Sequence, residues 1–107
     1  MFNKIRSVLP LADYSLMVCF ENGERKINDI SKLFEKRESL RAMAATNGLF
    51  KQVKVDSGGY GIRWNENAYL SCDELYKSGR TVPKESNLII YTPKFLVEDE
   101  EDEVEEA

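Results

Sequence analysis

The chain has 107 residues, of which 42% are apolar and 10% aromatic, so it can build one domain around a single core. It contains no histidine, which excludes the commonest general base, the Ser-His and Cys-His nucleophile pairs and most zinc sites. The net charge of −4 is unevenly distributed. Residues 98–107 hold eight of the nineteen acids, so the remaining eleven acids face fifteen bases, a net charge of +4 for residues 1–97.

No apolar run is long enough to span a bilayer, and the first residues lack the apolar block of a secretory signal. The two cysteines, Cys19 and Cys72, are too few for a disulfide framework and lack the spacing of zinc ligands. We therefore expect a reduced, cytoplasmic protein without membrane association.

The first third of the chain predicts a β-hairpin. Residues 4–9 and 15–20 are two apolar, β-prone runs, and residues 25–30 form a more polar third run. Asn22 and Gly23 lie between the last two runs. This dipeptide favours a two-residue type I′ turn, in which both residues take positive φ.

A two-residue turn also fixes which side chains share a face, because side chains alternate along a strand. Phe20 then faces Arg25, and Val18 faces Ile27. We therefore expect Ile27 on the core side of the hairpin, together with Leu16.

Two short helices are predicted in the middle of the chain. Residues 31–36 have room for one or two turns. In residues 39–48, Ser39 is the expected N-cap, and Asn47 with Gly48 supplies a left-handed stop.

Two further strands are predicted over residues 51–56 and 60–64. In the second of these, Tyr60, Ile62 and Trp64 share one face. The tryptophan is therefore expected to anchor the core, and the alternative is that it stacks on a partner.

The pattern Ser71-Cys72-Asp73-Glu74 is a capping box and predicts a helix over residues 72–77. These residues also place two carboxylates and a thiol near a helix N-terminus. However, neighbouring carboxylates on a helix diverge, and no histidine can serve as a base. We therefore expect no enzyme activity, no catalytic residue, no metal and no cofactor.

Strands on both sides of short helices predict an α+β fold, a single small domain with a mostly antiparallel β-sheet and two or three short helices. The domain is expected over residues 1–80. A C-terminal extension over 81–97, with an extra strand at 88–91, and a disordered acidic tail over 98–107 follow. The tail is either a solubilising terminus, an anionic arm for a basic partner or a shield for the chain's own basic face.

Five short blocks follow one another along the chain, at residues 20–24, 29–30, 48–55, 59–64 and 70–76. They read Phe-Glu-Asn-Gly-Glu, Asp-Ile, Gly-Leu-Phe with Val53 and Val55, Gly-Tyr-Gly-Ile-Arg-Trp and Leu-Ser-Cys-Asp-Glu-Leu-Tyr. In this order the chain resembles the bacterial family called domain of unknown function 2442, over about residues 4–80. Asn28 stands where the pattern leads us to expect an apolar or aromatic residue.

The resemblance implies a small α+β domain without established activity, so it assigns no catalytic residue. It also implies gene pairs that have been suggested to be toxin–antitoxin modules. The leading hypothesis is therefore a non-enzymatic domain that binds another small protein, as the antitoxin-like half of such a pair. The candidate interaction residues are Arg63, Trp64, Tyr69, Glu98, Asp99, Glu100 and Glu101.

The alternative hypothesis is a small nucleic-acid-binding regulator that uses the basic body of the chain. The bases are spread over several predicted elements, and an acidic tail opposes phosphate binding. A protein partner is therefore favoured, and the sequence does not indicate the oligomeric state.

Overall fold

The computed structural model describes residues 2–83; the predicted strand at 88–91 and the acidic tail at 98–107 lie outside the described residues. Two helices and seven strands in two antiparallel sheets confirm the α+β class for this part of the chain. The strands are β1 (Ile5–Pro10), β2 (Ser15–Phe20), β3 (Arg25–Asp29), β4 (Lys54–Val55), β5 (Gly61–Arg63), β6 (Tyr69–Ser71) and β7 (Arg80–Thr81). The helices are α1 (Glu38–Ala45) and α2 (Cys72–Ser78), with short 3₁₀ turns at η1 (Ala12–Tyr14), η2 (Ile30–Leu33), η3 (Phe50–Gln52) and η4 (Ser57–Gly59).

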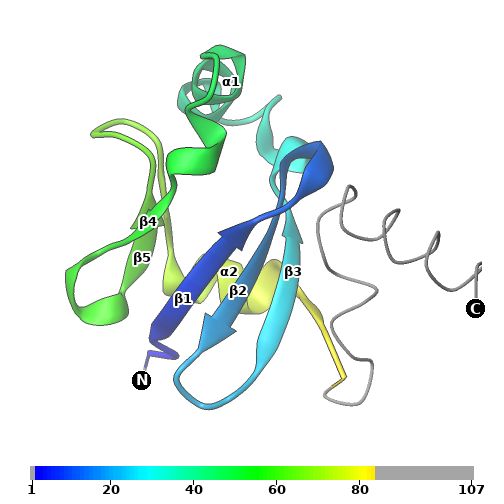
Figure 1. Ribbon diagram of the computed structural model, residues 1–107, viewed down its shortest axis with the longest axis vertical. Helices are drawn as coiled ribbons and strands as arrows, with labels where there is room; N and C mark the ends of the chain where they lie inside the picture. The colour runs from blue at the N-terminus through cyan, green and yellow to red at the C-terminus, as the bar shows by residue number, and fades with distance from the viewer. Residues whose placement is uncertain (1, 84–107) are drawn as a thin grey trace, which may run out of the picture.

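The larger sheet has the strand order β1-β2-β3-β7, and the smaller sheet has the order β4-β5-β6. In Figure 1 the larger sheet faces the viewer, α2 crosses behind it and α1 lies at the top of the molecule. β1 contacts β4, so the two sheets meet along this edge. The core therefore lies between the two sheets and beneath both helices.

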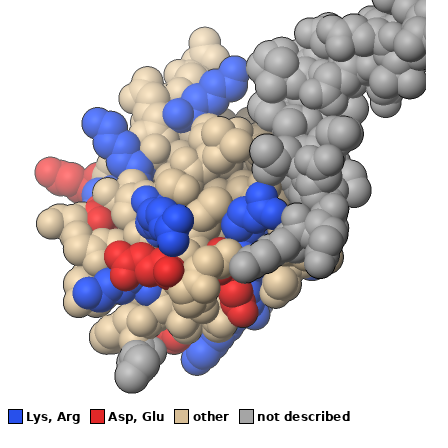
Figure 2. Space-filling view, turned by 60° about the horizontal axis from the view of Figure 1, so that its bottom comes forward, with Lys and Arg blue, Asp and Glu red and all other residues tan. Residues whose placement is uncertain are grey.

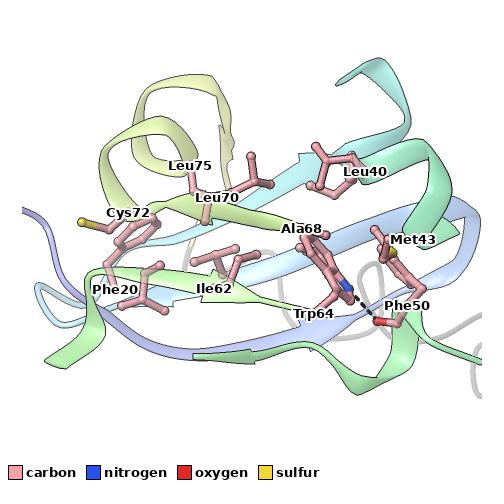
Figure 3. Packing of buried hydrophobic residues seen from close by; sticks show 14 residues of the cluster. Phe20, Leu40, Met43, Phe50, Ile62, Trp64, Ala68, Leu70, Cys72 and Leu75 are labelled. Carbon is pink, nitrogen blue, oxygen red and sulfur yellow. Dashed lines mark hydrogen bonds between the residues drawn. The ribbon is translucent and has the colours of Figure 1, made fainter. Parts of the chain in front are cut away.

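Side chains from both sheets and both helices fill this core (Figure 3). An apolar face on each sheet and an apolar stripe on each helix meet there, which is how such elements bury their hydrophobic surface. The main members are Ile5, Leu16, Val18, Phe20, Leu40, Met43, Phe50, Ile62, Trp64, Leu70, Cys72 and Leu75.

The β2–β3 hairpin forms as predicted, but the prediction of a two-residue turn is wrong. The amide of Phe20 donates to the carbonyl of Glu24 at 2.8 Å, and the amide of Gly23 donates to the carbonyl of Phe20 at 2.9 Å. Of the two residues predicted to take positive φ, Asn22 and Gly23, only Gly23 does so, with a φ of 95°. The loop therefore has three residues, the arrangement in which a type I turn is followed by a left-handed residue.

This longer loop shifts the register of β3 by one residue relative to the prediction. Val18 faces Lys26 and Leu16 faces Asn28, whereas Ile27 pairs with Met17. Ile27 is therefore not on the core side. Instead Lys26 and Asn28 are the two buried polar residues of the described chain.

The helix at residues 39–48 also starts differently from the prediction. α1 begins at Glu38, its N-cap is Arg37 without a side-chain cap, and Ser39 lies inside the first turn. The predicted stop is confirmed in part, because Gly48 takes a positive φ of 80°.

The smaller sheet is shorter than predicted. The chain over 50–52 is a 3₁₀ turn, so β4 is limited to two residues of the expected strand at 51–56. Tyr60 precedes β5 and is 49% exposed, so it does not share the core face with Ile62. It contacts Phe2 edge-to-face instead.

Candidate functional site

Trp64 belongs to the core and not to an interaction surface. It is 7% exposed, its ring stacks on Phe50, and its Nε1 donates to the carbonyl oxygen of Phe50 at 3.0 Å (Figure 3). A buried indole normally finds such a partner for its N–H group. The structure therefore removes Trp64 from the candidate interaction residues.

Arg63 and Tyr69, by contrast, are brought together on the outer face of the smaller sheet. They are opposite each other in the register between β5 and β6, and Lys54 of β4 is the next residue across. The Arg63 guanidinium lies 4.8 Å from the centroid of the Tyr69 ring, a cation–π contact. The Tyr69 side chain remains half exposed, so its ring is available to a partner.

Arg63 is held in this position by a two-point ion pair. Its Nε and Nη2 donate to the two carboxylate oxygens of Asp56, at 3.1 and 3.3 Å. Its Nη1 also donates to the main-chain carbonyls of Asn65 and Glu66. The planar guanidinium is therefore fixed before any partner arrives, which lowers the entropy that binding would cost.

Arg37, which the sequence did not single out, extends this surface. Its Nη1 donates to Oε2 of Glu74 at 2.8 Å, and its Nη2 donates to the carbonyl of Tyr69 at 3.2 Å. Glu74 also closes the predicted capping box with Ser71, which is confirmed. Arg37, Arg63 and Tyr69 form one continuous feature, which we call the Arg–Tyr surface.

A groove borders this surface at Glu74 and runs between β3, η2 and α2. Its volume is about 310 Å³. We call it the β3–α2 groove. Its apolar lining consists of Ile27, Ile30, Leu33, Leu70 and Leu75, and its polar residues are Ser15, Asn28, Asp29, Lys32, Glu74, Ser78 and Arg80.

The two acids of the groove are already engaged within the chain. Asp29 accepts hydrogen bonds from the amide and hydroxyl of Ser31 at 3.1 and 2.6 Å, and Glu74 pairs with Arg37. Lys32 and Arg80 form no ion pair within residues 2–83. The hydrogen bonds from Ser31 leave the negative charge of Asp29 in place, so the two bases and two acids that line the groove balance.

Potential metal ligands and thiols are dispersed over the described part of the chain. Within residues 2–83, no three His, Cys, Asp or Glu side chains are grouped so that they could hold a metal ion. Cys72 lies in the core, and Cys19 is a second free thiol. None of the helices in this range has the length and apolar character needed to cross a membrane.

Acidic and basic side chains are interspersed on the face shown in Figure 2, without a continuous basic field.

A family model described as "Protein of unknown function (DUF2442)" matches residues 5–81. The chain belongs to the DUF2442 family. No curated protein and no solved structure matches it.

The match confirms the resemblance that the five sequence blocks carry. The Arg–Tyr surface and the β3–α2 groove both lie inside the DUF2442 domain. Glu98, Asp99, Glu100 and Glu101 lie outside the described residues.

Proposed function

We propose that this DUF2442 domain is a non-enzymatic, cytoplasmic module that binds another small protein, in the antitoxin-like role of a two-gene pair. The observation that supports this most is the exposed pair of Arg63 and Tyr69, stacked on the outer face of the smaller sheet. Arginine and tyrosine are among the residues enriched at the energetic centres of protein interfaces.

The geometry of the pair suits recognition of a protein surface. Tyr69 offers a large amphipathic ring with few rotatable bonds, and Arg63 is already fixed by Asp56. Neither group therefore loses much conformational freedom on binding. The acids at 98–101 would add attraction to a basic partner and would mainly raise the association rate.

Nucleic acid is a weaker candidate. Two of the cations near Tyr69 are paired with carboxylates, Arg63 with Asp56 and Arg37 with Glu74. A phosphate backbone would have to displace these acids, whereas a protein interface tolerates mixed charge at its rim.

The test is capture of the partner by the full-length protein from the organism that encodes it, followed by mass spectrometry and titration calorimetry. We expect one small protein in stoichiometric amount. Tyr69→Ala should weaken its binding at least about tenfold, as loss of an interface centre does. Tyr60→Ala, the same change at a tyrosine that is equally exposed and lies outside the Arg–Tyr surface, is the matched control.

Retention of the partner by both Tyr69→Ala and Arg63→Gln, with the fold intact by circular dichroism, would overturn this proposal. Loss of the captured material on nuclease treatment would do the same, because it would identify nucleic acid as the ligand.

A further inference from the structure

We infer that the outer face of the larger sheet, which points away from the core, is a docking surface for the chain's own residues 88–91 (Leu-Ile-Ile-Tyr). We call these residues the strap, and we place it over Met17, Ile27 and Val82. The inference is independent of the proposed function. Four features support it: an apolar row on the outer face, two side chains that are buried outside the core, the apolar sequence of the strap and its reach.

The first feature is an apolar row that crosses three strands of the larger sheet. Met17 of β2 pairs with Leu9 of β1 on one side and with Ile27 of β3 on the other. Side chains alternate along a strand, so this row points away from Leu16 and Val18, which belong to the core. α2 crosses behind the sheet, on the side of the core (Figure 1). An apolar sheet face of this kind is stabilised when a further segment packs on it.

The second feature is burial outside the core. Met17 is 5% exposed and Val82, which follows β7, is 3% exposed, but neither is a member of the core cluster. The amide of Val82 donates to the carbonyl of Arg25 at 2.8 Å, two residues before Ile27, so Val82 continues the β3–β7 pairing on the outer face. Leu9, at the far end of the row, is 47% exposed. A cover over the β2, β3 and β7 half of this face accounts for the difference.

The third feature is the sequence that follows Val82. Residues 84–87 are polar (Lys-Glu-Ser-Asn), whereas residues 88–91 are apolar or aromatic and β-prone, and Pro93 comes shortly after them. A short polar connection followed by an apolar run is typical of a segment that leaves a strand and packs back on a surface. The strap therefore has the chemistry that the apolar row needs.

The fourth feature is reach. The six residues from Val82 to Leu88 can span up to about 20 Å. β7 and β2 are separated by β3 alone, which corresponds to a distance of about 10 Å. The strap can therefore fold back over Met17 without strain. Its tether also gives it a high effective concentration at this face, which favours the strap over a second copy of the chain as the occupant.

The experiment uses the full-length chain with ¹³C-labelled methyl groups and measures nuclear Overhauser effects between them. We expect cross-peaks from the methyl groups of Ile89 or Ile90 to those of Met17 and Val82. Assigned methyl groups without any such cross-peaks would overturn the inference.

A sample that mixes labelled and unlabelled chains separates the strap from a second copy. Isotope-filtered spectra of this sample detect only contacts between different chains. We expect no cross-peak between Ile89 or Ile90 of one chain and Met17 of another. Such a cross-peak would identify a second copy as the occupant and would overturn the assignment within one chain.

Charged substitutions in the strap provide a second measurement. The double variant Ile89→Asp, Ile90→Asp cannot cover the row without desolvating two carboxylates, so Met17 should become accessible. Oxidation of Met17 by hydrogen peroxide, followed by mass spectrometry, should be at least about fivefold faster than in the wild type. The matched control, Ser86→Asp with Asn87→Asp, adds the same two charges to the same segment and should leave the rate unchanged.

Met43, which is 1% exposed in the core, is the internal reference for an intact fold. Its oxidation should stay slow in both double variants. Equal oxidation rates of Met17 in the two variants, with Met43 protected, would contradict the inference. If Met43 also oxidises faster, the variant has lost its core, and the cross-peaks of the unsubstituted chain decide.

Discussion

The ammonium group of Lys26 donates a 2.7 Å hydrogen bond to the main-chain carbonyl of Tyr76 and lies 3.9 Å from the centroid of the Tyr76 ring. That carbonyl belongs to the last turn of α2, where the helix dipole and the free carbonyls favour a cation. Lys26 is only 9% exposed, and it forms no ion pair within residues 2–83. The end of the helix and the face of the ring therefore stabilise this buried charge.

Reversing the charge at this position should be severely destabilising. In Lys26→Glu a carboxylate would face the carbonyl end of α2 and the negative face of the ring, so we expect a loss of about 3 kcal/mol or more in the free energy of unfolding. Urea denaturation measures this loss. Lys36→Glu should change stability by no more than about 0.5 kcal/mol. Equal effects of the two substitutions would show that Lys26 is not stabilised in this way.

Gly23 is expected to be sensitive to substitution through its backbone alone. Its φ is 95°, and a Cβ built there would meet no atom within 4 Å. Gly23→Val should therefore cost about 1–2 kcal/mol of strain, and Gly23→Asn should cost less, because asparagine tolerates positive φ better. Thermal unfolding of the two variants decides this. A valine variant as stable as the asparagine variant would contradict the three-residue loop.

Gly79 is expected to be sensitive for the opposite reason. Its φ of −77° suits any residue, but a Cβ would lie 2.8 Å from Asn28 Nδ2, 2.8 Å from Lys26 Cβ and 2.9 Å from the carbonyl of Leu75. Gly79→Ala should overpack this contact between β3 and α2 and cost about 1–3 kcal/mol. Thr81→Ala, two residues on and exposed, is the control and should cost under about 0.5 kcal/mol by urea denaturation. Unchanged stability of Gly79→Ala would mean that β3 and α2 separate easily.

Tyr76 should make the stability of the domain depend on alkaline pH. Hydrogen bonding to the Glu24 carboxylate, with a smaller contribution from burial, raises the pKa of the Tyr76 phenol above its usual value of 10.0. The folded state then holds its proton more tightly than the unfolded state, so stability is lost as the pH rises from about 10 through the raised pKa.

Urea denaturation between pH 8 and 11 on the wild type and on Tyr76→Phe tests this linkage. The difference in stability between the two proteins should shrink across the upper part of that range, since phenylalanine has no proton to lose. A difference that stays constant with pH would show that the phenol does not interact with Glu24.

The elements that the sequence predicted well depend on local chemistry. The capping box of Ser71 and Glu74 and the positive φ of Gly23 each follow from residues close together in the chain. The turn type at Gly23 could not be predicted in the same way, because a two-residue loop and a three-residue loop both favour glycine there. The packing of α2 on β3 then favours the register that buries Lys26.

The candidate site likewise combines contacts that follow from local sequence with contacts that depend on the tertiary fold. The pairing of Arg63 with Tyr69 follows from a short antiparallel connection between two strands. Arg37 meets Glu74 only through the tertiary fold, 37 positions away in sequence, and no local pattern marks such a contact. The β3–α2 groove depends on the shifted register of β3, and it could not be predicted from the two-residue turn.

The three-residue loop at Gly23 sets the register of β3 against β2. Deleting one loop residue, such as Glu21, would shift β3 by one position, so each side chain of β3 would move to the opposite face of the sheet. Ile27 would turn inward, and Lys26 with Asn28 would turn toward solvent. The shortened chain would have a more apolar core. It would lose the hydrogen bond from Lys26 to the end of α2 and the Asn28 side of the groove. The length of this one surface loop therefore decides which side chains of β3 face α2, and with them the shape of the β3–α2 groove.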